Sequence, residues 1–346
     1  MKLKRSKKKQ PTYPYTVFIL GAGFSKDAGG LLIKDLLAQK ADIPEDYQYI
    51  WDLYERAKKR GIVTDVESFM DYLSGLSFLE LGWKIKRLKK RKSFVMASKI
   101  YSDTIIAVLN ILERAIDKVS SAGLPNFYSL FADKFLRLLN GGSHPTNSIV
   151  TFNWDVVCEQ MLLDGFKHLK YPSDQIKPYE DYVGFRKGIN VFKLHGSSNW
   201  LYCEKCNTIY AFEQSLAHDP TKIASYRCPK PGCRKALART IVPPTWEKTT
   251  YVNQLKALWK LAWNELREKA HQVIVLGYSF SDRDLLARYL IFTALAGNQN
   301  LKRVILVNGN SDDGESFLRG FLGDKVKNMR ATFADFVSSY DIKNLP

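Results

Sequence analysis

The chain has no apolar run that approaches the length of a membrane-spanning helix, so we expect none of its helices to cross a membrane. Its basic N-terminus, MKLKRSKKKQ, contains no apolar stretch and therefore does not resemble a secretory signal peptide. We expect a cytoplasmic protein that does not bind membranes. Apolar residues make up 45% of the chain, which is enough for a substantial core.

Acidic residues are also scarce relative to basic ones, and the formal net charge is +17. Many of the basic residues fall in two runs, at residues 1–10 and 84–92. One interpretation is a disordered tail over residues 1–14 and a solvated helix face; the other is a contact for nucleic acid or an acidic partner. The runs contain few aromatic residues, so stacking on single-stranded nucleic acid is not indicated.

The chain shows no internal repeat; instead, short apolar runs alternate with segments of helical periodicity. Buried strands are expected at residues 15–20, 148–151, 190–194, 272–276 and 303–307. Helices are expected from about Lys26, at residues 156–163, 252–269 and 282–294, and again in the last fifty residues. This alternation predicts an α/β fold with a doubly wound, Rossmann-like parallel sheet.

Two segments interrupt the alternation. Residues 44–140 have helical spacing and predict a helical module inserted between the first two strands. Residues 199–243 contain four of the five cysteines and predict a small separate lobe.

Polar strings follow three of the expected strands: residues 21–25 (GAGFS), residues 151–155 (TFNWD) and His195-Gly196. The carboxyl ends of parallel strands share one edge, where open α/β sheets bind ligands. A Gly-Ala-Gly turn lets backbone N–H groups approach a pyrophosphate, although such turns also serve tight strand–helix packing alone. The full dinucleotide fingerprint with its ribose-binding acid is lacking, which disfavours an ordinary dehydrogenase.

Asn153, Asp155 and His195 are the candidate catalytic residues. Asn153 and Asp155 could simply cap the helix that follows them. Capping does not require both, however, and an amide with a carboxylate can also hold a carboxamide or place a water near a ribose carbon. His195 at the third strand end is a candidate base, with a purely structural role as the alternative.

Four cysteines have the spacing of a zinc site. The pairs Cys203-x-x-Cys206 and Cys228-x4-Cys233 are separated by 21 residues, which suits tetrahedral coordination by four thiolates. Four thiolates leave no open position, so the Zn2+ would be structural. Two disulfides are the alternative, disfavoured in a reducing compartment. Cys158 is expected to be a buried packing residue.

The ordered motifs resemble those of the sirtuin family over roughly residues 15–310. Sirtuins carry Gly-Ala-Gly-x-Ser, Thr-x-Asn-x-Asp, His-Gly and a four-cysteine zinc ribbon in this order. The resemblance implies one NAD-binding domain over residues 15–346, with NAD+ as substrate. The residues it implies for NAD+ binding are Gly21, Ala22, Gly23, Ser25, Gly277, Ser279 and Asn308.

Three departures separate the chain from the protein deacetylases of that family. The deacetylase string Pro-Asp-Phe-Arg is missing, because Gly29-Gly30 runs into residues 31–34 (LLIK). Residues 241–246 (IVPPTW) replace the segment that pairs with an acetyl-lysine peptide, and two prolines remove two backbone donors. The third departure is the helical insertion. These features, with GYSFSD at residues 277–282, resemble the sirtuin-like NAD hydrolases of bacterial anti-phage systems.

The resemblance implies an NAD+ hydrolase that releases nicotinamide and ADP-ribose and depletes NAD+ in anti-phage defence. Two alternatives remain open: an NAD-dependent protein deacylase or ADP-ribosyltransferase, and a non-catalytic sensor of NAD+ or ADP-ribose that binds a partner. A toxic hydrolase needs restraint, which implies a homo-oligomer or a regulatory subunit such as a HerA-like ATPase. The helical insertion is the expected contact surface.

Overall fold

The structure is a computed structural model that describes residues 14–32, 35–38, 40–83, 92–120, 123–137, 147–165, 177–178, 189–212, 223, 225–243, 249–309, 312–341 and 345. The basic residues 1–10 and 84–91 lie outside this set, as do residues 244–246. The expected basic tail and the second proline of the IVPPTW segment therefore receive no structural account.

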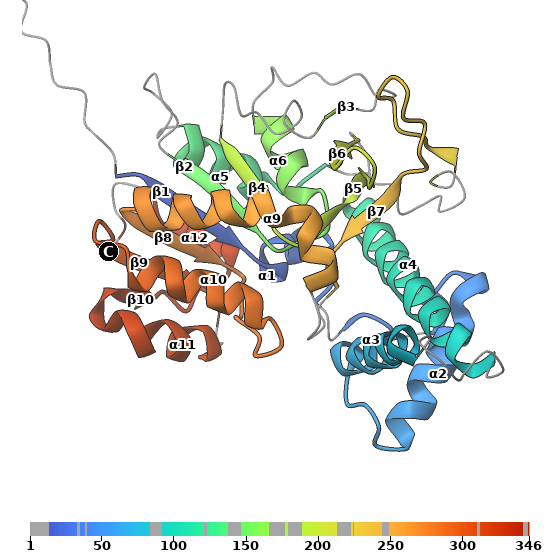
Figure 1. Ribbon diagram of the computed structural model, residues 1–346. Coiled ribbons are helices and arrows are strands. Elements are labelled where there is room, and N and C mark those ends of the chain that lie inside the picture. Colours follow the sequence, from blue (N-terminus) through green and yellow to red (C-terminus); the bar gives the residue numbers. More distant parts are fainter. Residues whose placement is uncertain are drawn as a thin grey trace, which may run out of the picture.

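A six-stranded, entirely parallel sheet forms the centre of the fold (Figure 1). In chain order its strands are β1 (Thr16–Leu20), β2 (Asn147–Thr151), β4 (Asn190–Lys193), β8 (Gln272–Leu276), β9 (Arg303–Val307) and β10 (Val326–Asn328). In space they follow the order β4-β2-β1-β8-β9-β10, so the order reverses between β1 and β8. This topology is that of a doubly wound sheet and confirms the predicted α/β class.

Helices cover both faces of this sheet (Figure 1). On one face α9 (Thr249–Asn264), which continues as a π-helix over Glu265–Lys269, packs on α10 (Leu285–Ala296), and α10 packs on α11 (Asp313–Leu322). On the other face α5 (Asn126–Phe131) contacts both α6 (Val157–Gly165) and α12 (Phe333–Ser339). The strands between these layers are almost completely buried, which explains their continuous apolar runs.

The first helix differs from its prediction. It was expected from about Lys26, but α1 (Ala22–Ser25) begins directly after Gly21, and a 3-10 turn follows over Lys26–Ala28. The Phe24 N–H donates to the Gly21 carbonyl, so the helix starts within the glycine turn itself. Gly29, with φ of +86°, ends the segment.

The segment between β1 and β2 contains α2 (Gln48–Lys59), α3 (Val66–Trp83) and α4 (Lys92–Ser120). These helices share an apolar cluster of their own and project away from the sheet in Figure 1. The cluster includes Ile50, Phe69 and Val108. Leu112 on α4 and Tyr128 and Phe131 on α5 belong instead to the core of the sheet, so the later part of the segment packs against the sheet and the earlier part does not.

A second, four-stranded sheet has the order β3-β6-β5-β7. Its strands are β3 (Lys177–Pro178), β5 (Gly196–Cys203), β6 (Thr208–Ala211) and β7 (Ala238–Ile241). Strand β5 begins directly after His195 and ends at Cys203, so one strand links the edge of the parallel sheet to the cysteines.

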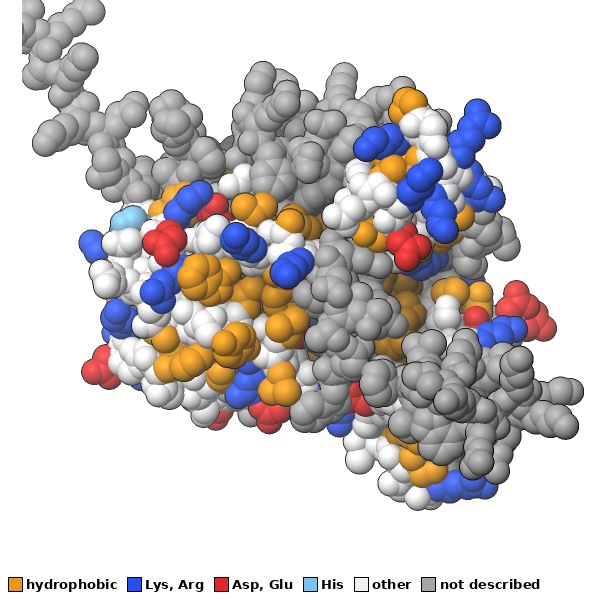
Figure 2. All heavy atoms as spheres, viewed as in Figure 1, with side chains coloured by type: hydrophobic (Ala, Val, Ile, Leu, Met, Phe, Trp, Pro, Cys, Tyr) orange, Lys and Arg blue, Asp and Glu red, His pale blue; other side chains and the backbone are white. Residues whose placement is uncertain are grey.

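Among the helices that the structure describes, none combines the length and the hydropathy that a membrane span requires. Apolar side chains do gather on the face of the molecule that carries α9 and α10 (Figure 2). The large exposed ones on these two helices are Leu261, Leu285, Tyr289 and Phe292.

Candidate functional site

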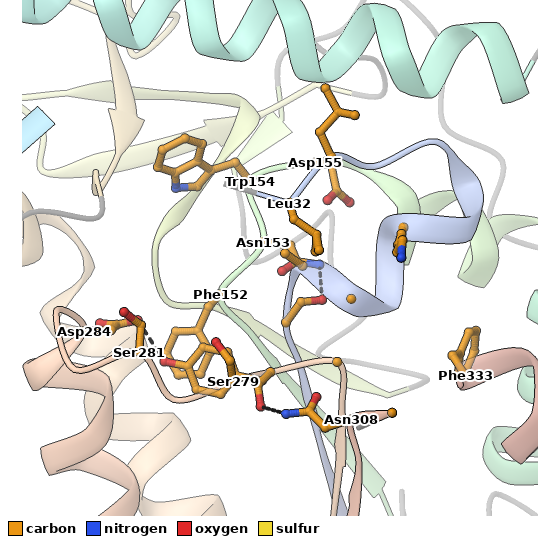
Figure 3. Close-up of a pocket in the computed structure, with 18 of the residues that line it drawn as sticks. Leu32, Phe152, Asn153, Trp154, Asp155, Ser279, Ser281, Asp284, Asn308 and Phe333 are labelled. Carbon is orange, nitrogen blue, oxygen red and sulfur yellow. Dashed lines mark hydrogen bonds between the residues drawn. The ribbon is translucent and has the colours of Figure 1, made fainter. Parts of the chain in front are cut away.

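A cavity of about 490 Å³ lies at the carboxyl edge of the parallel sheet, where the strand order reverses (Figure 3). Residues from all three polar strings line it, together with the loops after β8 and β9. The predicted site residues in its wall are Gly21, Ala22, Gly23, Asn153, Asp155, His195, Gly277, Ser279 and Asn308. The structure therefore brings together residues that lie more than two hundred positions apart in the sequence.

The glycines of the first turn are required by contacts between two loops. A Cβ on Gly21 would lie 2.5 Å from the Gly277 carbonyl oxygen, and one on Gly277 would lie 2.4 Å from the Gly23 carbonyl carbon. Gly277 also has φ of +64°, a conformation that favours glycine. The packing interpretation of the glycine turn thus has direct support.

The same contacts correct one detail of the expected pyrophosphate site. The Gly21 N–H donates to the Leu276 carbonyl at 3.0 Å, and the Gly23 N–H donates to the Gly277 carbonyl at 2.9 Å. These two amides are therefore already used within the chain. Lys26, which lines the cavity just beyond the turn, offers a positive charge for a phosphate and was not predicted.

Asn153 is held through its side-chain amide. Its Nδ2 donates to the Gly21 carbonyl at 2.9 Å (Figure 3). It also donates to Ser25 Oγ at 3.0 Å. Both amide hydrogens are engaged, so Oδ1 is the atom that this side chain can offer to a ligand as an acceptor. Buried Ser25 also donates to Asp155 Oδ1 at 3.1 Å, which places it to orient Asn153 and Asp155 together.

Asp155 caps the helix that follows it. Its Oδ1 accepts the Val157 N–H at 3.0 Å at the start of α6, which confirms the capping interpretation. Burial raises the pKa of this carboxyl, and the nearby Lys193 charge opposes that shift. Lys193 donates to the main-chain carbonyl of Asp155 and forms a buried ion pair with Glu159 at 2.9 Å. Asp155 therefore both supports the loop and faces the cavity.

His195 is almost completely buried, and its neighbours fix it from several sides. Its Nε2 lies 3.4 Å from Asp284 Oδ2, and its ring meets Phe152 edge-on with centroids 5.1 Å apart. Its carbonyl accepts the Val242 N–H at 2.8 Å. Gly196 follows with φ of +77°, and a Cβ there would lie 1.8 Å from the Thr240 carbonyl oxygen. Only glycine allows β7 to approach so closely at this point.

Asn308 holds the loop that follows β8. Its Nδ2 donates to the Tyr278 carbonyl at 2.6 Å, so the ends of β8 and β9 are tied together beside the cavity (Figure 3). Ser279 lies in the same loop and lines the cavity. Contacts of Asn308 and Ser279 with an adenosine ribose stay predictions.

Charged residues missed by the sequence analysis complete the wall. Arg283 lines the cavity and pairs with Asp65 at 3.0 Å, while its Nε lies 3.8 Å from Glu67 of α3. The helical segment thereby contributes to the site, since Glu67 and Met70 also line the cavity. Burial raises the pKa of Glu67, and Arg283 opposes that shift. The sequence carries no signal for a contact between such distant segments.

The four cysteine thiols of the lobe fit a metal. Their sulfur atoms all lie within 4.8 Å of one another, with Cys203 and Cys233 3.6 Å apart and Cys206 and Cys228 3.7 Å apart. Tetrahedral zinc with Zn–S bonds of about 2.3 Å places its ligand sulfurs about 3.8 Å apart, close to these separations. They are far longer than a disulfide bond, so the disulfide alternative is not supported. Cys158 is buried elsewhere, as expected.

Comparisons with known proteins give no family assignment. No protein-family model and no curated protein matches the chain. One similar solved structure is described by the words "Structural Basis for the Mechanism and Regulation of Sir2 Enzymes"; it has 13% identity and a TM-score of 0.42, and the match covers 94% of this chain and 90% of that one. Another is a Phe-to-Ala mutant of a Sir2 homologue in complex with ADP-ribose, with 15% identity, a TM-score of 0.42, and coverage of 94% and 89%. At these values the likeness does not show the family, and the case for function depends on the geometry of the site.

Proposed function

We propose that this protein hydrolyses NAD+ to nicotinamide and ADP-ribose. One observation carries the proposal: Asn153 and Asp155 follow β2, His195 follows β4, and all three line one cavity with the glycine turn that follows β1. The cavity lies where the strand order reverses, the place at which doubly wound sheets bind dinucleotides. Its volume of about 490 Å³ falls within the range of about 300–1,000 Å³ typical of small-molecule sites.

In this proposal NAD+ spans the cavity along the sheet edge. The adenosine end lies near Asn308 and Ser279, and the pyrophosphate lies near Ala22 and the Lys26 ammonium. The nicotinamide end lies near Asn153 and Asp155, where a carboxylate can accept hydrogen bonds from a carboxamide.

The reaction breaks the bond between the ribose and the nicotinamide nitrogen, which takes the bonding electron pair. The ribose carbon becomes electron-poor and is attacked by water, whose surplus proton goes to the base. In this proposal Asn153 Oδ1 accepts a hydrogen bond from that water or from a ribose hydroxyl. Among the described residues that line the cavity, His195 is the only imidazole, and we assign it the role of base.

Water is favoured over a peptide substrate because the segment expected to pair with a peptide is already engaged. The Val242 N–H donates to the His195 carbonyl at 2.8 Å, and the Val242 carbonyl accepts Trp154 Nε1 at 3.2 Å. Pro243 has no N–H to donate. At Val242, the backbone groups that β-pairing with a peptide would need are therefore used within the chain.

The proposal also covers the metal, the biological role and the control of the activity. We propose Zn2+ as a structural ion of the cysteine lobe and an NAD-depleting role in cytoplasmic anti-phage defence. Control by self-association or by a HerA-like ATPase, and nucleic-acid binding by the basic tail, are further elements of it. Gel filtration of the chain alone and with candidate partners tests this control, and a fully active monomer would contradict it.

The hydrolase proposal is tested by incubating purified protein with NAD+ and measuring nicotinamide and ADP-ribose. His195→Ala should lower the rate by about 10²–10⁴-fold, the usual contribution of a general base. His271→Ala is the matched control, because this histidine is not among the cavity-lining residues. Equal rates for the wild type and His195→Ala would reject the assigned mechanism.

A further inference from the structure

We infer that Asp284 is a positioning residue for His195: its carboxylate orients the imidazole and stabilises the positive charge that forms when His195 takes a proton. The inference rests on the proposed hydrolase function and adds a residue that no sequence motif assigned.

Asp284 and His195 face each other across a buried corner of the cavity. His195 Nε2 lies 3.4 Å from Asp284 Oδ2, and the two residues are 6% and 8% exposed, respectively. The Tyr278 hydroxyl donates to the same Oδ2 at 2.8 Å (Figure 3). All three residues line the cavity, so the pair is held next to the space that a substrate would fill.

Asp284 stands at the start of a helix, where an aspartate side chain usually caps the helix. It is the N-cap of α10, where the side chain usually accepts a helix N–H. Here the side chain makes no capping hydrogen bond. Asp155 and Thr332 do accept helix N–H groups at the starts of α6 and α12. The Asp284 carboxylate instead lies beside the imidazole and accepts the Tyr278 hydroxyl.

The loop that carries Asp284 has an uncommon backbone shape. Phe280 has φ of +57°, which is uncommon for any residue other than glycine and which clusters at functional sites. Tyr278, two residues earlier, stacks on Phe152 with ring centroids 4.5 Å apart, and Phe152 also meets the His195 ring. The loop therefore carries both Asp284, which lies beside the imidazole, and Tyr278, which stacks on the Phe152 ring that the imidazole meets edge-on.

The groups around the pair leave the Asp284 carboxylate as the hydrogen-bond acceptor for the Tyr278 hydroxyl and for His195 Nε2. Burial raises the pKa of Tyr278 well above its usual value, and the Asp284 carboxylate adds to the shift, so the hydroxyl remains a donor. Arg283 extends toward the acidic residues at the start of α3, and Arg288 reaches Asp282. A carboxylate beside Nε2 favours the neutral tautomer with its hydrogen on Nε2, which makes Nδ1 the basic nitrogen.

Kinetics of two substitutions of Asp284 and one control substitution test the inference. Asp284→Asn should lower kcat for NAD+ cleavage by about 10–10³-fold, since the orienting carboxylate of a catalytic histidine contributes on this scale or more. The KM for NAD+ should change little, because the carboxylate acts through His195, and Asp284→Glu should restore part of the rate. Asp282→Asn is the matched control, because that carboxylate is 91% exposed two residues away.

Heteronuclear NMR of nitrogen-labelled histidine gives a readout that needs no activity. The signals of His195, assigned by their loss in His195→Gln, should show the hydrogen on Nε2 in the wild type and a changed tautomer balance in Asp284→Asn. If Asp284→Asn does not fold, the wild-type spectrum alone decides the pairing.

The outcomes separate this inference from the proposed function. An unchanged kcat in folded Asp284→Asn, or a raised KM at unchanged kcat, would overturn the positioning role. Hydrogen on Nδ1 in the wild type would do the same. A wild type that leaves NAD+ intact would reject the hydrolase, whereas the NMR experiment would still report whether Asp284 sets the state of His195.

Discussion

The carboxyl edge of the parallel sheet and the cysteine lobe are stabilised in different ways. At the sheet edge, buried strands and backbone contacts between residues 21–23 and Gly277 shape the site. In the lobe, the buried apolar cluster is small and includes two of the thiols themselves. Small clusters of this kind usually depend on a metal for stability. The comparison indicates that the site is built by the sheet and that the lobe supports it from outside.

Strand β5 connects the two regions. It leaves the sheet edge at Gly196, beside His195, and reaches the lobe at Cys203. It pairs with β7, whose next residue, Val242, donates to the His195 carbonyl. We therefore expect substitutions at the sheet edge to abolish NAD+ cleavage. Metal loss or cysteine substitution in the lobe should only lower its rate.

The largest effect is expected at the sheet edge from Asn153→Ala. This change removes Oδ1 from the cavity together with the hydrogen bonds to Gly21 and Ser25. NAD+ cleavage should fall by about 10³-fold, while thermal unfolding stays cooperative. Asn300→Ala, at an exposed hydrogen bond far from the cavity wall, is the control. Full activity of Asn153→Ala would remove the basis of the mechanism.

The backbone contact at the sheet edge is tested by Gly277→Ala. The new Cβ meets main-chain atoms at 2.4 Å and must adopt a positive φ, so we expect about 3 kcal/mol of destabilisation in urea unfolding. Gly320→Ala is the matched control, since a Cβ there meets no atom within 4 Å inside α11. That variant should be slightly more stable than the wild type. Equal stability of the two variants would contradict the packing argument.

Removing the metal tests how far the cysteine lobe supports activity at the site. We expect one zinc per chain, and chelation or Cys203→Ser should lower NAD+ cleavage by about tenfold as β5 loses its anchor. Elemental analysis and activity before and after zinc is restored measure both effects. Full activity without metal would show that the lobe does not support His195. Complete loss with a folded sheet would show that the lobe belongs to the site.

The smallest effect is expected from an acetyl-lysine peptide. Because Val242 is hydrogen-bonded within the chain on both sides, the peptide should change the rate of nicotinamide release by less than about twofold. The measurement is nicotinamide release at saturating NAD+ with acetylated and unmodified peptides. Strong stimulation by the acetylated form would favour the deacylase or transferase alternative.

Much of the parallel sheet could be predicted because its strands are buried on both faces. β1 and β8 are continuous apolar runs, and such runs show in the sequence. β10 was missed because Val326 is its only apolar residue and it is only three residues long. The first helix began earlier than predicted, since hydrogen bonds inside the glycine turn start it there.

The site was predictable only where it follows strand ends. Asn153, Asp155 and His195 come directly after short apolar runs, so their meeting follows from the topology. Arg283 and Glu67 meet only through a tertiary contact between two distant segments, which no local pattern records. Asp284 begins a helix, where an aspartate is normally explained as a cap, and only coordinates show its side chain beside His195.

The central claim is that water attacks NAD+ in the cavity formed at this edge. The most direct test is to incubate the purified protein with NAD+ in isotopically labelled water and to analyse the products by mass spectrometry. The claim predicts nicotinamide and ADP-ribose in equal amounts, with one labelled oxygen on each ADP-ribose and about 10³-fold slower product formation by Asn153→Ala. Intact NAD+, or ADP-ribose attached to protein instead of free in solution, would contradict it.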